Sequence, residues 1–229
     1  MKKGIFVATS NVANFDAALT MLEDTEKGRP GMAMAFGPAG MGKTMAAMRA
    51  YATRGGAYVR TMEQMSQAAF LGALCFEVSG SRPNGAHACK TRIIEALEAH
   101  PRTLFVDEAD RLDIRRIEDL RDIHDTTGCP AVLIGEQGLP TKVGARARID
   151  DRIPDGYRIK FEPIKAKDIL VFAQEAAGLA LTPEACALAA AETKGNFRRV
   201  FGLVLSLEQA ARAANTAEVS ADMVRRVAA

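Results

Sequence analysis

The sequence lacks the features of a membrane or secreted protein. No apolar run among its 229 residues approaches the roughly 18 residues that a membrane span requires. The lysines at positions 2 and 3 are followed by too little hydrophobicity for a signal peptide. We therefore expect a cytoplasmic protein with no membrane partner.

The sequence also lacks a zinc-binding pattern and a strong charge of either sign. It contains no C-x-x-C pair and no histidine at metal-ligand spacing from a cysteine, so no zinc site is expected. With 30 lysines and arginines against 28 aspartates and glutamates, the net charge of +2 neither demands nor excludes nucleic acid. Reduced, mostly buried thiols are expected at Cys75, Cys89, Cys129 and Cys186.

What the sequence does contain is a phosphate-binding pattern. Residues 32–36 are typical of a buried strand and residues 45–51 of a helix, and between them runs G-x-x-x-x-G-K-[ST]. Its glycines let consecutive backbone amides point at one phosphate, the lysine adds positive charge, and the threonine offers a hydroxyl to Mg²⁺. The pattern predicts a nucleoside triphosphate held by Gly37, Pro38, Ala39, Gly40, Met41, Gly42, Lys43 and Thr44.

A second motif lies some 60 residues downstream, at the end of T-L-F-V-D-E (residues 103–108). An apolar run followed by two acids describes a buried strand that presents carboxylates at its carboxyl end. Asp107 is predicted to hold Mg²⁺, directly or through water. Glu108 is predicted to polarise the water that attacks the γ-phosphate.

The order of elements divides the chain into two parts. Helices are predicted to begin at Ser10 and to span residues 62–76, and a turn is predicted at Arg29–Gly31. Further strands are predicted at residues 57–61, 131–134 and 158–161. After Pro163 only helical patterns follow. We expect an α/β nucleotide-binding body over residues 1–163 and a helical lid domain over residues 164–229.

In this order of signals the chain resembles the AAA+ ATPase family over roughly residues 10–225. The phosphate loop, the Asp-Glu strand end, a later strand with a polar tip, an arginine before the last strand and a helical appendage all follow the family's layout. The resemblance implies a P-loop αβα sandwich with a five-stranded parallel sheet ordered 5-1-4-3-2. It also implies ATP and Mg²⁺ as cofactors and ATP hydrolysis that depends on assembly into a homo-oligomer.

The resemblance also assigns roles outside the two motifs. G-N-F-R at residues 195–198 looks like the second-sensor motif, which makes Arg198 the arginine that reaches the γ-phosphate. D-D-R-I at residues 150–153 looks like the arginine-finger element, with Arg152 as the candidate and Arg146 and Arg148 as alternatives one turn away. The first sensor at the strand tip is either Glu136 or Gln137, where the family usually has Asn, Ser or Thr.

Within the family, the short chain looks most like the target-selection ATPases of DNA transposition, of the Mu B type, in a bacterial or phage-infected cell. This resemblance implies that the protein forms a ring or helical filament on duplex DNA. It would bind this DNA with little sequence preference and hand it to a transposase. The alternatives are an ExeA-like assembly ATPase directed at a protein and a replication initiator or helicase loader. The candidate DNA contacts are Arg60, Thr61, Arg82, Lys90 and Arg92.

Overall fold

The computed structural model describes residues 6–24 and 31–228, so Arg29 and Pro30 of the predicted turn lie outside the described residues. The described chain forms two compact units. One comprises residues 6–13, 39–42 and 161–228, and is called the helical unit below. The other comprises residues 14–24, 31–38 and 43–160, and is called the sheet unit.

The sheet unit is built on five parallel strands in the order β2-β3-β4-β1-β5, which confirms the predicted topology. The inner strands β3 and β4 are mainly apolar and are buried along their whole length, as expected where helices cover both faces of a parallel sheet. The bounds are β1 (Met32–Phe36), β2 (Ala57–Arg60), β3 (Leu104–Asp107), β4 (Ala131–Gly135) and β5 (Arg158–Lys160).

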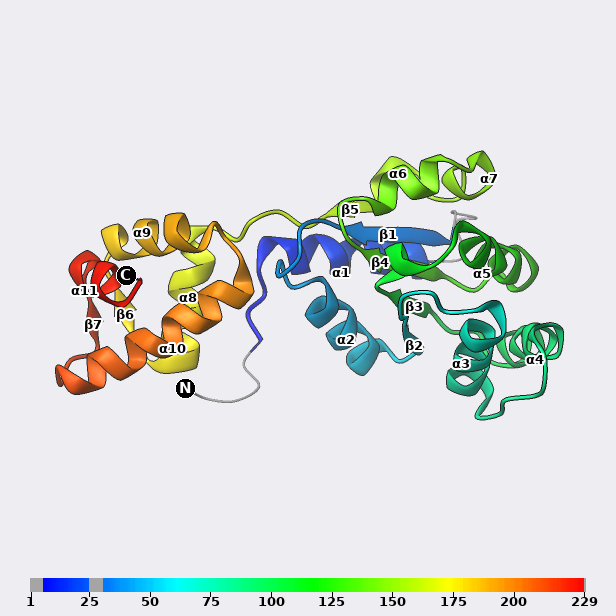
Figure 1. Ribbon diagram of the computed structural model, residues 1–229, viewed down its shortest axis with the longest axis horizontal. Helices are drawn as coiled ribbons and strands as arrows, with labels where there is room; N and C mark the ends of the chain where they lie inside the picture. The colour runs from blue at the N-terminus through cyan, green and yellow to red at the C-terminus, as the bar shows by residue number, and fades with distance from the viewer. Residues whose placement is uncertain (1–5, 25–30, 229) are drawn as a thin grey trace. The chain divides into compact units, whose positions relative to one another are not determined.

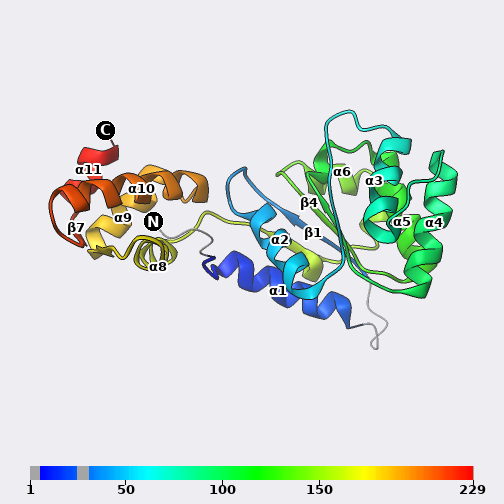
Figure 2. The ribbon, with the colours of Figure 1, turned by 90° about the horizontal axis from the view of Figure 1, so that it is seen from below.

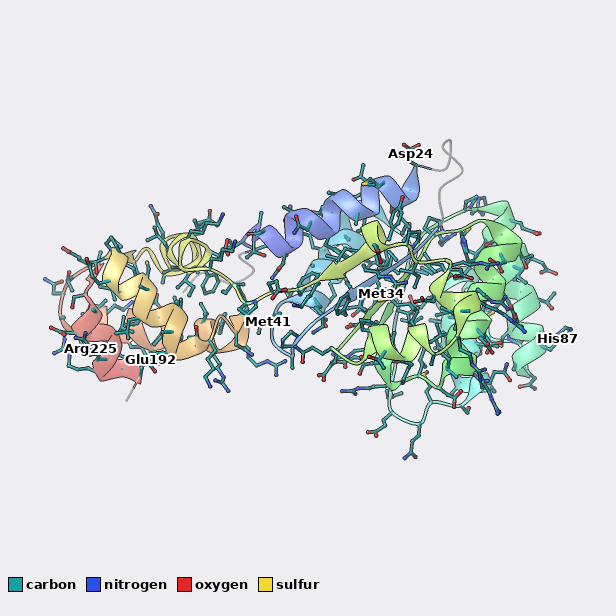
Figure 3. All side chains as sticks on the ribbon, turned by 90° about the horizontal axis from the view of Figure 1, so that it is seen from above. Asp24, Met34, Met41, His87, Glu192 and Arg225 are labelled. Carbon is teal, nitrogen blue, oxygen red and sulfur yellow. The ribbon has the colours of Figure 1, made fainter. Side chains whose placement is uncertain are left out.

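Helices cover both sides of these strands. Figure 2 shows α2 on one side of the strands and α3, α4 and α5 on the other. In Figure 3, Met34 lies in the interior of the sheet, whereas His87 lies at the outer end of α4. The helix α1 (Ser10–Glu23) begins in the helical unit and continues in the sheet unit. The others are α2 (Lys43–Arg54), α3 (Gln67–Ser79), α4 (Ala86–Ala99), α5 (Ile114–Thr127), α6 (Leu139–Gly144) and α7 (Ala147–Asp150).

The helical unit contains α8 (Ala166–Ala177), α9 (Pro183–Thr193), α10 (Phe197–Ala213) and α11 (Ala221–Ala228). It also contains two parallel strands of two residues each, β6 (Ala180–Leu181) and β7 (Glu218–Val219), which the sequence did not predict. Val7 belongs to the apolar core of this unit. The predicted division near residue 163 therefore differs from the observed units in two segments: residues 6–13 and residues 39–42 both belong with the C-terminal helices.

The expectation for the cysteines has a structural counterpart. All four cysteines are described, and each is buried and forms no disulfide. Within residues 6–24 and 31–228, no helix is both long enough and apolar enough to cross a membrane.

Candidate functional site

The predicted phosphate loop connects β1 to α2 and has the backbone that its glycines allow. Gly40 and Gly42 adopt φ angles of 80° and 92°, which residues with a side chain rarely adopt. Lys43 opens α2, and its Nζ donates to the carbonyl oxygens of Gly37 and Pro38, at 2.8 Å each. The lysine is thus folded back onto its own loop, and a bound phosphate would replace these two carbonyl groups as its acceptor.

The electrostatics around Lys43 are dominated by burial and by nearby acids. Burial lowers the pKa of Lys43 from its usual value, and carboxylates oppose this shift without reversing it. Glu136 at the tip of β4 has the largest opposing effect. The others are Asp110, Glu108 and Asp107. Both predicted motifs and the β4 tip therefore lie within electrostatic reach of one ammonium group.

Asp107 and Thr44, the two predicted Mg²⁺ residues, are in contact. The Thr44 hydroxyl donates to Asp107 Oδ2 at 3.0 Å, although 63 residues separate them in the chain. A hydroxyl and a carboxylate are the hard oxygen donors that Mg²⁺ prefers, and one or two protein ligands suffice when substrate phosphates supply others. These two residues fit a Mg²⁺ ion, which when bound would neutralise charge on the phosphates.

The Asp107 carboxylate has a second hydrogen-bond donor, which the sequence did not predict. The Tyr58 hydroxyl, from β2, donates to the same Oδ2 at 2.7 Å. Burial and the Asp107 carboxylate raise the pKa of Tyr58 well above its usual range, so the phenol stays protonated and acts as a donor. The remaining oxygen, Oδ1, accepts the backbone N–H of Glu108 at 3.0 Å.

Glu108 has an unusual backbone for a residue with a side chain, with φ 57° and ψ 33°. Such left-handed conformations cost on the order of 1–3 kcal/mol and persist where neighbours hold them, often at functional sites. Thr61 is one such neighbour: its hydroxyl donates to the Glu108 carbonyl oxygen at 2.7 Å and lies 3.1 Å from that of Asp107. Thr61 is only 1% exposed, so this predicted DNA contact instead supports the end of β3.

The Glu108 carboxylate is held by two arginines. Arg60 Nη2 lies 3.0 Å from Oε1, and Arg111 Nε lies 3.2 Å from Oε2. Arg60 meets Glu108 because β2 and β3 are adjacent parallel strands, with Arg60 opposite Asp107 in register. Each oxygen therefore has one arginine partner, and the two ion pairs together restrain the orientation of the carboxylate.

At the tip of β4, Glu136 and Gln137 are both exposed. The Glu136 backbone N–H donates to Asp110 Oδ1 at 2.9 Å. Lys142 Nζ in turn donates to the backbone oxygens of Asp110 and Leu112. The tip of β4 is thus tied to the segment that follows Glu108, and the choice of first sensor between Glu136 and Gln137 stays a prediction.

Arg152 lies just after α7 and forms a double ion pair with Asp125 in the last turn of α5, at 2.9 and 3.1 Å. In Figure 1, α7 lies at the opposite end of the sheet from the end of β1 and the start of α2. Arg146 and Arg148 lie at the same end and are exposed. The last turn of α5 precedes the amino end of β4, so Arg152 lies near the amino ends of the strands, whereas Lys43 and Thr44 follow the carboxyl end of β1.

Arg198 lies in the first turn of α10, in the helical unit, and is exposed. Residues 39–42 belong to this unit as well, and they contact the start of α10. The Phe197 backbone N–H donates to Gly40 O at 2.8 Å, and Asn196 Nδ2 donates to Ala39 O at 2.9 Å. Arg198 therefore follows directly after two residues that bind the loop tip, and its role as second sensor stays a prediction.

The other predicted DNA contacts lie on or near α3 and α4. Lys90 forms ion pairs with Asp119 at 3.3 Å and Asp122 at 2.7 Å, so a DNA phosphate would have to displace these carboxylates. Arg82 donates to Gly72 O at 3.2 Å and its side chain is exposed. Arg92 is exposed beside Glu95 at 3.4 Å. Of the five candidates, Arg60, Arg82 and Arg92 keep exposed side chains.

Sequence reasoning missed Tyr58 and Arg111. Arg111 has a local signal, because its position three residues after Glu108 suits an ion pair across one helical turn. Tyr58 has none, since its contact with Asp107 depends on which strands are neighbours and in what register.

Comparison with solved structures shows the fold. The ORC2 protein of Aeropyrum pernix, solved as ADPNP and ADP complexes, matches with a TM-score of 0.73 and 14% identity, over 99% of this chain and 70% of ORC2. The RuvB protein of Thermotoga maritima matches with a TM-score of 0.59 and 19% identity, over 97% of this chain and 69% of RuvB. At such identities the likeness concerns the fold alone.

Comparison of sequences gives the family. No curated protein sequence matches the chain. The AAA domain family model matches residues 26–143, which include the phosphate loop, Asp107, Glu108 and the β4 tip. Because this match covers more than half of the 229 residues, the chain belongs to the AAA domain family of ATPases.

Proposed function

We propose that this ATPase assembles into an oligomer on duplex DNA and that contacts with DNA and with a neighbouring subunit control its hydrolysis of ATP. The observation that carries the proposal is the position of Arg60. Its side chain is 60% exposed at the carboxyl ends of the strands, yet it binds Glu108, the predicted water-polarising residue.

An anionic polymer that contacts Arg60 would compete with Glu108 for the same guanidinium group. DNA phosphates are such a polymer, and arginine is a common phosphate donor. Release of Glu108 Oε1 would then allow this carboxylate to orient water. RuvB, which shares the fold, is a Holliday junction branch migration motor, and this likeness supports DNA as the polymer.

The position of Arg152 supports the oligomer. An arginine that stabilises charge during phosphoryl transfer must reach the transferring phosphate. Because Arg152 pairs with Asp125 near the amino ends of the strands, whereas its own phosphate loop follows the carboxyl end of β1, it would act on the site of a neighbouring copy. Its pair with Asp125 is partly exposed, at 37% and 33% for the two side chains. Such pairs contribute about 0–1 kcal/mol, so the arginine can be released at little cost.

The proposal is tested by retention of a fluorescent duplex at low salt. We expect retention with a non-hydrolysable ATP analogue and none with ADP. Two unrelated duplex sequences should bind equally, because backbone contacts carry little sequence information. Affinity should fall by about 10³-fold or more between roughly 50 and 200 mM salt if six or more phosphates are contacted. Absence of retention with the analogue would contradict the proposal.

Replacement of Arg60 by alanine tests whether the ion pair between Arg60 and Glu108 restrains ATP hydrolysis. We expect Arg60→Ala to raise the ATPase rate without DNA by about two- to fivefold, because an exposed ion pair restrains Glu108 by no more than about 1 kcal/mol. Stimulation of the rate by DNA should be lost. Steady-state phosphate release with and without duplex DNA measures both effects.

The matched control is Arg92→Ala, which removes an exposed arginine whose ion-pair partner is Glu95 rather than Glu108. This control should leave the rate without DNA unchanged. If Arg60→Ala also leaves that rate unchanged and retains stimulation by DNA, Arg60 does not restrain Glu108.

Within DNA-acting ATPases, we propose target selection in DNA transposition, with a transposase as partner. Its support is the sequence resemblance described above. A replication initiator or helicase loader is the second candidate, since ORC2 shares the fold. Electron microscopy with ATP and duplex DNA, followed by addition of a cognate transposase or helicase, separates the two: only the physiological partner should change the ATPase rate.

A further inference from the structure

Tyr58 is held in place on the side of β2 that faces α2. Its ring contacts that of Tyr51 in α2, with centroids 5.9 Å apart and planes inclined by 37°. The same helix begins with Lys43 and Thr44. Tyr58 is half-buried in this position, so contacts with α2 restrict the ring that carries its hydroxyl.

The Tyr58 hydroxyl is one of the hydrogen-bond donors that hold the buried Asp107 carboxylate. Asp107 is 2% exposed, and among the described residues its carboxylate forms no direct ion pair, although Lys43 lies within electrostatic reach. A buried carboxylate without a direct ion pair depends on hydrogen-bond donors. Three are present: the Glu108 N–H on Oδ1, and the hydroxyls of Thr44 and Tyr58 on Oδ2. The Tyr58 contact is the shortest, at 2.7 Å, as expected for a phenol and a carboxylate.

The shared oxygen links Tyr58 to the predicted metal residues. Thr44 and Asp107, the two Mg²⁺ residues, meet at Oδ2, which is also where Tyr58 donates. Without this donor Oδ2 would keep only the Thr44 hydroxyl, and two hydrogen bonds instead of three would hold the carboxylate in its orientation. We propose that the Tyr58 hydroxyl is a positioning group for Mg²⁺, which keeps the Asp107 carboxylate oriented toward Thr44.

Hydrogen-bond donors behind a metal-binding carboxylate typically change metal affinity by about 10- to 100-fold when removed. This inference rests on nucleotide binding at the phosphate loop and is independent of DNA. It therefore holds or fails separately from the proposal that DNA controls hydrolysis.

The test compares Tyr58→Phe with Tyr51→Phe in the full chain. Both changes remove one hydroxyl from neighbouring rings and keep the rings, but only the Tyr58 hydroxyl binds Asp107. Binding of a fluorescent ATP analogue is measured first in EDTA and then across a titration of free Mg²⁺. We expect Tyr58→Phe to raise the Mg²⁺ concentration at half-maximal effect by about 10- to 100-fold.

Affinity for the analogue in EDTA should stay within about twofold of the parent, since Tyr58 acts on the site through Asp107. Tyr51→Phe should match the parent in both measurements. An unchanged Mg²⁺ midpoint in Tyr58→Phe would overturn the proposal. A Tyr58→Phe chain that is unfolded by thermal melting, or that loses affinity equally in EDTA, would assign the hydroxyl a structural role and would also overturn it. If the parent binds the analogue neither in EDTA nor in the presence of Mg²⁺, nucleotide binding itself is contradicted.

Discussion

Replacement of Arg152 by alanine is expected to lower ATP turnover by about a thousandfold or more, because an arginine that reaches the transferring phosphate of a neighbour contributes on that order to the rate. Nucleotide binding by isolated chains should be unchanged, since Arg152 pairs with Asp125 near the amino ends of the strands and Lys43 follows the carboxyl end of β1. Folding should also be retained, because Asp125 keeps Arg121 as a second partner at 3.6 Å. Phosphate release and analogue binding measure the two effects.

A mixture of inactive variants tests whether the arginine acts on a neighbouring copy. Lys43→Ala should abolish nucleotide binding but keep Arg152, whereas Arg152→Ala keeps the phosphate loop. In equal mixtures, about a quarter of the sites would combine an intact loop with an intact neighbouring arginine, as a head-to-tail interface requires. Activity should return to about that level. No recovery would argue against action in trans, and loss of turnover in Arg146→Ala or Arg148→Ala instead would move the role to that residue.

Replacement of Glu108 by glutamine is expected to lower hydrolysis by about 10²- to 10⁴-fold, the range for a lost general base. The amide of glutamine is uncharged at neutral pH, and it would also lose the ion pairs with Arg60 and Arg111. ATP should still bind, so the assembled state should persist. Single-turnover hydrolysis and size-exclusion chromatography with ATP measure these outcomes.

The matched control is Glu95→Gln, which makes the same chemical change in α4 and removes only an exposed pair with Arg92. It should hydrolyse ATP like the parent. If Glu108→Gln also does so, its carboxylate is not the group that activates water. If it fails to bind ATP, the ion pairs of Glu108 are needed for the fold of the loop rather than for chemistry.

Much of the fold was predictable because its signals are local. A few consecutive residues are enough to recognise the apolar runs that form β1, β3 and β4 and the glycines before α2. The order of the strands followed from the family resemblance and is confirmed. The start of α3 was misplaced by five residues, because Ser66 caps the helix by accepting the Ala69 N–H. The strands β6 and β7 are two residues long, too short to show alternation.

The sequence by itself determined the phosphate loop and the two acids after β3, since each is a short motif whose residue types suit phosphate, Mg²⁺ and water. Only the tertiary structure decided what these acids bind. Tyr58 meets Asp107, and Arg60 meets Glu108, because parallel strands bring distant residues together at one edge. It also decided that Thr61 and Lys90 are engaged within the protein. Such partners depend on strand register and helix packing, which no local pattern specifies.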